Sequence, residues 1–394
     1  MTGEKRGLEG YDIVCISSVD WDPIWTRKQQ IMSRLPGSNR ILYIEPPITL
    51  LSAFKDRSLW FKWGRWLKGA RRKTENIYLY SPPVVLPFGN KYSWVNRLNQ
   101  RWLLIFIRRI AHKLGMKKPL VWTYMPNSLL LARGLGPQCL IYDCVDEHSE
   151  YTGLINKRVM LEMERELIES CHLVFVTAPG LYEDKKPFAR EIHLLPNAAD
   201  VDHFARADLE ETVVPDEISR LPRPLVGFVG VIHDWIDQDL IEFLARSRPD
   251  WSFAMIGPVG AGISVERLKA LPNVYFFGRR DKEDLPGYIK AFDVCINPFK
   301  KNSLTERVSP LKFYEYLASG RPVVSVDMPG VREFSDVVEI AGDHRSFLEA
   351  LERSLARESP ARKKGRLESA ARNSWESRVE FMSEKIMEVL GKHR

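Results

Sequence analysis

Short apolar runs alternate with helix-length segments along nearly the whole chain, and the alternation starts afresh near residue 224. In the first half the apolar runs cover residues 12–19, 40–44, 120–124, 139–142, 173–176 and 192–195, with a helical stretch at 24–35. In the second half they cover residues 224–232, 252–256, 274–277, 294–297 and 322–326. Short continuous apolar runs separated by helices are typical of parallel sheets covered on both faces. The pattern therefore predicts an α/β chain with two doubly wound, Rossmann-like domains.

The length of the chain agrees with this, because 394 residues are too many for one ordinary hydrophobic core. The segment 208–223 is polar, contains proline and has no clear period, so we place the domains at 1–205 and 206–372. An amphipathic helix follows within 373–394, after the second sheet is complete. Its apolar stripe consists of Trp375, Val379, Met382, Ile386 and Leu390.

The composition is that of a soluble globular protein, with 44% hydrophobic and 28% charged residues. No stretch approaches the roughly 18 apolar residues of a spanning helix, and the amino terminus lacks the apolar core of a signal peptide. We therefore expect a cytoplasmic protein. The five cysteines are odd in number and lie mostly in apolar runs, which predicts buried free thiols and no metal site.

A net charge of +7 calls for an anionic partner. Nucleic acid, an acidic membrane surface and a phosphorylated substrate all meet that description.

The segment 309–325 predicts a helix that could hold a phosphate. Ser309 suits the N-cap, Pro310 the first helical position and Gly320 the left-handed residue after the end. Leu311, Tyr314, Leu317 and Ala318 share one face, which we expect to be buried, whereas Lys312 and Glu315 lie off that face.

The positive end of this helix and Lys312 suit a diphosphate. Glu315 lies about 9 Å along the axis from Ser309, close to the distance from a diphosphate to the ribose hydroxyls. Alternatively, Lys312 and Glu315 form a solvated pair three residues apart on an exposed face.

From Glu315 to Val324 the chain reads Glu-Tyr-Leu-Ala-Ser-Gly-Arg-Pro-Val-Val. Four further segments occur in order, at 195–204 (Leu-Pro-Asn-Ala-Ala-Asp-Val-Asp-His-Phe), 226–230 (Val-Gly-Phe-Val-Gly), 272–278 (Pro-Asn-Val-Tyr-Phe-Phe-Gly) and 291–299 (Ala-Phe-Asp-Val-Cys-Ile-Asn-Pro-Phe). Together they resemble the bacterial group-1 glycosyltransferases, which are retaining, metal-independent enzymes of family-4-like type with the GT-B fold. The resemblance covers nearly the whole chain and is strongest from 192 to 326.

The resemblance implies two Rossmann-like domains facing a cleft, with the last helix crossing back to the first domain. It implies transfer of a sugar from a nucleoside-diphosphate sugar, UDP rather than GDP, to a glycan or lipid-linked acceptor in cell-envelope or exopolysaccharide synthesis. The sugar nucleotide is then a substrate, and neither cofactor nor metal is expected. The donor residues would be Gly230, His233, Gly278, Arg279, Asn302, Thr305, Ser309, Pro310, Leu311, Lys312 and Glu315, with Glu315 on the ribose.

Two departures from the family pattern affect the chemistry. Many members carry a second Glu eight residues before the ribose Glu, where this chain has Arg307. Many also place an Arg and a Lys after the glycine turn, where this chain reads Val-Ile-His-Asp-Trp-Ile-Asp from residue 231. The cations at the phosphates would then come from Arg307, Lys312, Lys300 and Lys301, and we assign Arg307 and Lys312 to catalysis.

Ligands of doubly wound domains collect at the carboxyl ends of the strands. In the first domain this predicts an acceptor site at Ser18, Trp21, Trp25, Arg27 and Asp146. Asp20 and Asp22 are candidate catalytic carboxylates near the acceptor hydroxyl. Equally, they could cap the helix that follows.

Residues 51–73 interleave basic and aromatic side chains, including Lys62, Trp63, Arg65 and Trp66. This fits a segment lying on an anionic membrane surface, which would make the protein peripheral on the cytoplasmic face. A packing loop that covers the first sheet is the main alternative. Single-stranded nucleic acid fits less well, and we expect no nucleic-acid partner.

Other functions remain open at this point. The same fold hosts nucleotide-sugar 2-epimerases and hydrolases. A non-catalytic binding protein, for instance a scaffold in an envelope-assembly complex, is a third reading, and it predicts no stabilisation by UDP or GDP. An NAD dehydrogenase fits poorly, because Gly227 and Gly230 are not followed by the third glycine of the dinucleotide fingerprint.

Overall fold

The structure is a computed structural model that describes residues 7–55, 63–150, 155–303 and 305–392. The chain divides into two compact units. The first comprises Met1–Leu195 together with Arg378–Arg394, and the second comprises Pro196–Ser377. The first unit thus ends at Leu195, whereas we placed the boundary after residue 205.

The first unit is built on an eight-stranded sheet with strand order β3-β4-β2-β1-β5-β6-β7-β8. All neighbouring strands are parallel except β3 and β4. The strands are β1 (Asp12–Ile16), β2 (Arg40–Ile44), β3 (Arg71–Arg72), β4 (Ile77–Tyr80), β5 (Leu120–Thr123), β6 (Cys139–Cys144), β7 (Leu173–Val176) and β8 (Ile192–Leu194). The helices are α1 (Arg27–Arg34), α2 (Leu50–Lys55), α4 (Ser93–Lys113), α5 (Leu129–Gly134), α6 (Lys157–Ser170) and α7 (Pro179–Lys185).

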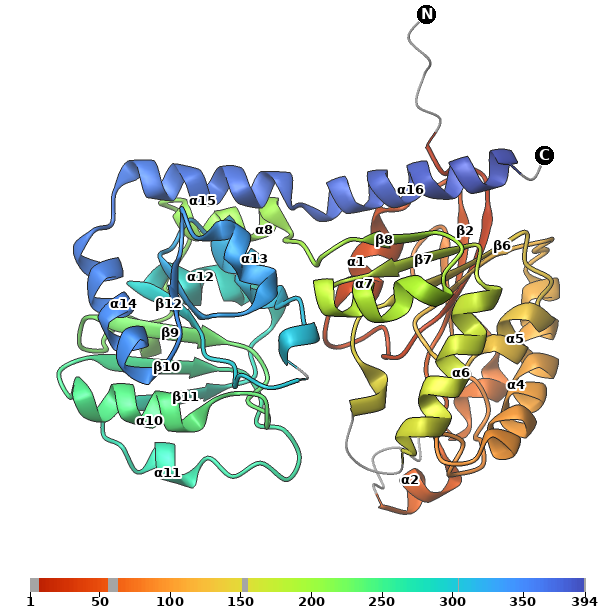
Figure 1. Ribbon diagram of the computed structural model, residues 1–394, viewed down its shortest axis with the longest axis horizontal. Helices are drawn as coiled ribbons and strands as arrows, with labels where there is room; N and C mark the ends of the chain where they lie inside the picture. Colours follow the sequence, from red (N-terminus) through yellow and green to blue (C-terminus); the bar gives the residue numbers. More distant parts are fainter. Residues whose placement is uncertain (1–6, 56–62, 151–154, 304, 393–394) are drawn as a thin grey trace, which may run out of the picture. The chain divides into compact units, whose positions relative to one another are not determined.

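The second unit is built on a six-stranded parallel sheet with strand order β11-β10-β9-β12-β13-β14. Figure 1 shows this sheet with α12 and α13 drawn above its strands and α10 below them. The strands are β9 (Leu225–Val229), β10 (Ser252–Ile256), β11 (Val274–Gly278), β12 (Val294–Asn297), β13 (Val323–Val326) and β14 (Glu339–Ala341). The helices are α8 (Val201–Ala205), α9 (Asp216–Ser219), α10 (Gln238–Ser247), α11 (Glu266–Lys269), α12 (Leu285–Ala291), α13 (Leu311–Ala318), α14 (His344–Ala356) and α15 (Pro360–Arg372).

The order of the strands determines where each sheet can bind a ligand. The chain runs outward from β1 to β2 on one side and to β5 on the other, and from β9 to β10 on one side and to β12 on the other. At such a switch point the loops after two adjacent strands diverge, which opens a crevice at the carboxyl ends. The α/β architecture with two Rossmann-like units is confirmed.

The last helix, α16 (Trp375–Lys392), begins in the second unit and continues into the first. Within the first unit the Tyr11 hydroxyl donates to Met387 Sδ at 3.5 Å, and Phe381 packs edge-on against His193. Among the described residues, no helix is both long and apolar enough to cross a membrane.

All five cysteines are buried free thiols, as predicted. Burial raises the pKa of Cys139 and of Cys295 to about 12. The thiols therefore act as small apolar side chains of the two cores.

Candidate functional site

Three glycine turns lie side by side at the carboxyl edge of the second sheet. Gly230 follows β9, Gly257 follows β10 and Gly278 ends β11, and each has a positive φ. The Gly230 amide donates to Ile256 O and the Gly257 amide donates to Gly278 O, both at 2.8 Å. A Cβ atom on Gly257 would lie 1.9 Å from Gly230 O, so no side chain fits there. The edge therefore presents bare backbone to which a ligand can come close.

His233 follows the first of these turns, at Gly230, and is firmly held. Its ring stacks on Trp235 with 4.1 Å between centroids, and its Nδ1 pairs with Asp234 Oδ1 at 2.5 Å. A Cβ on Gly260 would come within 2.4 Å of His233 Cδ2. The predicted donor residues Gly230, His233 and Gly278 thus share one edge, and Arg279 follows as an exposed side chain.

Helix α13 starts differently from our prediction. Its N-cap is Pro310, in an extended conformation, and Ser309 is not the cap. The buried Ser309 hydroxyl accepts the Asn197 amide at 3.0 Å, and Asn197 Nδ2 donates to Ser309 O at 2.8 Å. Because another backbone amide already uses this hydroxyl, Ser309 holds the Pro-Asn segment to the helix instead of capping it. Leu311 is half-buried, whereas Gly320 has the predicted positive φ of 70°.

Lys312 and Glu315 form an ion pair on α13, with 2.7 Å between Nζ and Oε2. The Glu315 side chain is only 7% exposed and that of Lys312 is 29% exposed, so the pair is not the solvated one of our alternative. Within the described parts of the chain, Lys312 is the only residue whose side chain hydrogen-bonds the Glu315 carboxylate. A buried carboxylate with one cationic partner retains acceptor capacity for a ligand hydroxyl.

Tyr316 joins α13 to the strand that ends in the glycine turn. Its hydroxyl accepts the Val229 amide at 2.7 Å and donates to Val229 O at 3.3 Å. Complete burial raises the pKa of this phenol well above its usual value. Neighbouring Glu315 is therefore positioned relative to the end of β9. Sequence reasoning missed Tyr316, because a tyrosine on a helix ordinarily indicates only core packing.

The loop after β12 carries several of the predicted donor residues, and part of that prediction is wrong. Thr305 is buried, and its hydroxyl accepts the Asn302 amide at 3.0 Å while Asn302 Oδ1 accepts the Thr305 amide at 3.0 Å. These two side chains close the loop on itself, so Thr305 is not available to a donor. Arg307 donates to Ser303 O at 3.1 Å in the same loop, and Lys300 and Lys301 are exposed.

At the carboxyl edge of the first sheet, two predicted acceptor residues belong to the core. Trp21 is 1% exposed and packs edge-on against Tyr43 and Trp25, so it does not offer a face to a sugar ring. Arg27 is buried, with its Nε 2.9 Å from Asp143 Oδ2 and its Nη1 donating to Leu195 O at 3.0 Å. We had expected both side chains to bind the acceptor.

The carboxylates Asp20 and Asp22 do not cap the next helix. Thr26 is the N-cap of α1 and forms a capping box with Gln29. Asp22 is exposed and lies 3.0 Å from Lys73 Nζ, whereas Asp20 is half-buried. Ser18, Trp25 and Asp146 are also half-buried, so a partly accessible polar rim remains at the ends of β1 and β6.

Lys28 joins this rim as a residue that sequence reasoning missed. It is buried, and burial lowers its pKa despite the attraction of Asp146 and Asp143. A lysine in a helix next to an arginine is usually read as solvated, and nothing in the local pattern indicates otherwise.

Comparison with known proteins shows which family and which fold this chain resembles. Residues 223–357 match the sequence model of the glycosyl transferases group 1. TuaH of Bacillus subtilis (strain 168), named as a teichuronic acid biosynthesis glycosyltransferase, is 28% identical over 254 residues, which span 60% of this chain and 63% of TuaH. The sucrose-phosphate synthase of Thermosynechococcus elongatus superposes with a TM-score of 0.71 at 16% identity, over 97% of this chain and 100% of that one. HepE of Anabaena superposes with a TM-score of 0.66 at 15% identity, over 96% of this chain and 99% of HepE. These structures have the GT-B fold, and so does this chain.

Proposed function

We propose that this chain is a bacterial group 1 glycosyltransferase. It would transfer a sugar from a UDP-sugar to a glycan or lipid-linked acceptor of a cell-envelope polysaccharide. The match of residues 223–357 to the family model and the similarity to TuaH support this proposal. The observation that carries the proposal is Glu315, a buried carboxylate held by Lys312 at the carboxyl edge of the second sheet. This edge is lined by the turns at Gly230, Gly257 and Gly278.

The donor would be held at both ends of its nucleoside diphosphate. Glu315 would accept hydrogen bonds from the ribose hydroxyls, and charge-assisted bonds of this kind are among the stronger ones in proteins. The diphosphate would lie at the start of α13, near Lys312 and the cations of the 300–307 loop. UDP is favoured as the nucleotide because HepE was solved with UDP, UDP and glucose, and UDP-glucose.

The reaction forms a bond from an acceptor oxygen to the anomeric carbon and breaks the bond from that carbon to the diphosphate oxygen. With retention, the leaving diphosphate takes the proton from the acceptor hydroxyl, and no metal or protein base is required. Lys312 and Arg307 would stabilise the negative charge that develops on the diphosphate. Asp20 and Asp22 would orient the acceptor, together with Ser18, Trp25 and Asp146.

The proposal includes a peripheral position on the cytoplasmic face of an anionic membrane. Part of the basic, aromatic segment 51–73 falls at 56–62, outside the described residues. Trp66 packs edge-on against Phe106 of α4, and Trp102, one turn earlier in α4, also packs edge-on against Phe106. Exposed apolar side chains continue along α4 as Trp94, Leu98, Trp102 and Ile105, beside Arg97, Arg101 and Arg108. An apolar stripe with a cationic border is typical of interfacial helices.

The test is donor binding by Glu315→Gln, measured by isothermal titration with UDP and GDP. Loss of a charge-assisted bond costs about 1.5–3 kcal/mol, so UDP should bind roughly 10 to 150 times more weakly. Glu349→Gln is the matched control, because that exposed glutamate also pairs with a basic residue on a helix. Wild-type UDP affinity together with full transfer in Glu315→Gln would contradict the donor assignment.

Two measurements on the wild-type protein distinguish the proposed function from its alternatives. Incubation with UDP-sugar alone should release little product, whereas an isomerised or hydrolysed sugar would identify an epimerase or a hydrolase. A protein that binds no nucleotide would be a non-catalytic component.

A further inference from the structure

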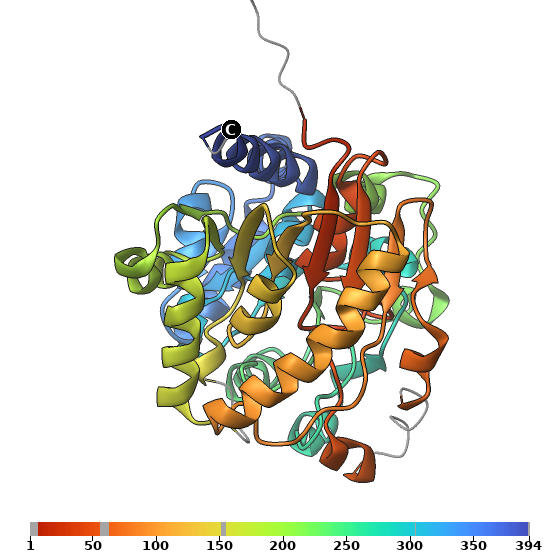
Figure 2. The same ribbon diagram turned by 90° about the vertical axis from the view of Figure 1, so that its right-hand side faces the viewer.

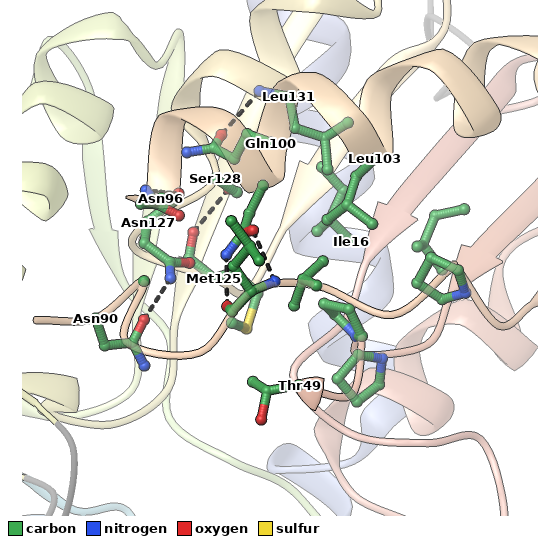
Figure 3. A pocket seen from close by; sticks show the side chains of 18 of the residues that line it. Ile16, Thr49, Asn90, Asn96, Gln100, Leu103, Met125, Asn127, Ser128 and Leu131 are labelled. Carbon is green, nitrogen blue, oxygen red and sulfur yellow. Dashed lines mark hydrogen bonds between the residues drawn. The ribbon is translucent and has the colours of Figure 1, made fainter. Parts of the chain in front are cut away.

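A cavity of about 240 Å³ lies at the carboxyl edge of the first sheet, entirely within the first unit. Ile16 and Ser17 at the end of β1 and Ile44 at the end of β2 form one side. Leu103 of α4 and Leu131 of α5 form another side (Figure 3). None of the functions assigned above uses this cavity.

The amide side chains around the cavity are engaged in building its wall. Asn99 accepts the Leu86 amide at 3.0 Å and donates to Leu86 O at 2.9 Å. Gln100 Oε1 accepts the Leu131 amide at 2.8 Å, and Asn127 Nδ2 donates to Asn90 Oδ1 at 2.7 Å. Figure 3 shows the bonds from Gln100 to Leu131 and from Asn127 to Asn90. The amides therefore fasten the 82–90 loop and α5 to α4.

The surface left for a ligand is apolar. It includes Pro46, Pro47, Val85, Leu103, Ile107 and Leu131. Among the described residues that line the cavity, Glu45 is the only charged one, and its Oε1 already lies 3.0 Å from Arg71 Nη2. A nucleotide or sugar phosphate would find no cation there, whereas an apolar group would find close contacts on several sides.

We propose that this cavity holds the hydrocarbon portion of a lipid-linked acceptor, an inference that rests on the proposed function. Its volume exceeds the roughly 150 Å³ that accommodates a benzene molecule, so a short stretch of chain fits. The helix that lines one side of the cavity, α4, also carries exposed Arg97 and Arg101, whose charge is opposite to that of a lipid phosphate. Ser17 lines the cavity directly beside Ser18, so a chain held here places its head group near the proposed acceptor rim.

The surroundings of the cavity favour a ligand drawn from a lipid surface. Two of its lining residues, Leu86 and Phe88, are exposed. The chain continues from them through exposed Tyr92 into α4, whose outer side carries Trp94 and Leu98. Figure 2 shows α4 in orange across the near side of the first unit. An apolar surface thus leads from the cavity to the stripe on α4.

The experiment measures binding of farnesyl phosphate and n-dodecyl phosphate, each below its micelle concentration, by isothermal titration. Met125→Trp and Pro87→Trp place a larger side chain at half-buried lining positions. Each should weaken binding of the chain phosphates at least tenfold. Met125→Leu, which conserves volume, and Leu161→Trp, on the exposed side of α6, should bind as the wild type does.

The outcomes separate the possible sources of the chain. Binding of farnesyl phosphate alone supports an isoprenoid acceptor, and binding of both supports any hydrocarbon chain. Absence of binding by the wild type, or unchanged binding in both tryptophan variants, overturns the proposal. If neither variant folds, a diazirine-bearing farnesyl phosphate decides with the wild type, because labelling must fall within 82–90 and 99–107.

UDP affinity measured on the same samples keeps the two proposals distinguishable. The cavity variants should bind UDP as the wild type does. Normal chain binding in a protein that fails to bind UDP would reject the donor assignment and leave the cavity assignment standing.

Discussion

Lys185 is the centre of a buried charge triad in the first unit, and replacing it should destabilise that unit strongly. Its Nζ lies 3.0 Å from Glu147 Oε2 and 2.7 Å from Glu164 Oε2, and all three side chains are at most 6% exposed. The Tyr142 hydroxyl also donates to Glu164 at 2.7 Å. Lys185→Met would leave two carboxylates buried without their cation.

The magnitude follows from the cost of unpaired buried charge. Removing one partner of a buried ion pair costs about 3–5 kcal/mol. In a domain of about 200 residues each kcal/mol lowers the Tm by about 2–4 °C, so we expect a loss of about 6–20 °C. The exposed pair of Lys269 with Glu266 provides the matched control, and Lys269→Met should change the Tm by less than about 2 °C.

The pH dependence provides a second readout. Burial tends to raise the pKa of Glu147, but Lys185 and the hydrogen bonds from Ser149 and Lys185 hold it below its usual value. A lowered folded-state pKa gives stability above the unfolded-state pKa, near 4.3, that is lost as the pH falls through the folded-state value. Burial tends to lower the pKa of Lys185, yet Glu164 and Glu147 raise it above its usual value. That contribution is present below about pH 10.4 and is lost as the pH rises through the folded-state pKa.

The assay is thermal unfolding by circular dichroism between about pH 3 and about pH 11, a range that reaches below the unfolded-state pKa of a glutamate and above that of a lysine. Glu147→Gln and Glu164→Gln, added to Lys185→Met, should recover part of the lost Tm because they remove the unpaired charges. A decrease of less than 2 °C in Lys185→Met, or no recovery in the triple variant, would refute this account of the triad.

Three further predictions concern the second sheet and α4. Tyr316→Phe removes both hydrogen bonds to the Val229 backbone, so it should lower the free energy of unfolding in urea by about 1–3 kcal/mol and weaken UDP binding. An unchanged free energy of unfolding and an unchanged UDP affinity would mean that α13 is held by packing alone. Gly257 has a φ of 142°, and a Cβ there would lie 1.9 Å from Gly230 O, so Gly257→Ala should lower the free energy of unfolding by about 1–3 kcal/mol or more and weaken UDP binding. Gly262→Ala is the control, because its Cβ would meet no neighbour, and it should leave UDP binding intact. Trp94→Ser with Trp102→Ser should reduce co-sedimentation with anionic vesicles, and equal sedimentation of the variant would argue against the α4 stripe.

Much of the fold could be predicted because buried parallel strands produce a direct sequence signal. The segments 40–44, 173–176, 252–256 and 294–297 form strands with the predicted bounds. Strand β4 was missed although Ile77-Tyr-Leu-Tyr80 is apolar, since it follows a polar turn and is short. Strand β14 has only three residues and little period to detect.

The candidate site was less accessible to sequence reasoning, because the use of a polar side chain depends on its neighbours in space. Ser309 has the residue type of an N-cap, but Asn197, 112 positions away, already donates to its hydroxyl. Trp21 follows β1 and Arg27 begins α1, near the predicted ligand edge, but both side chains are buried. Glu315 was recognised from its place in the helix, yet only the structure revealed that its carboxylate is nearly buried.

The assignment of Arg378–Arg394 to the first unit has a consequence for synthesis of the protein. The contacts of Tyr11 with Met387 and of His193 with Phe381 form only after residues 378–392 have left the ribosome. About 180 residues of the second unit are made in between, which takes about 10–40 s at usual elongation rates. During that time the first unit lacks the part of α16 that belongs to it, so a chain stopped at residue 377 should be sensitive to proteases and one extended through residue 394 resistant.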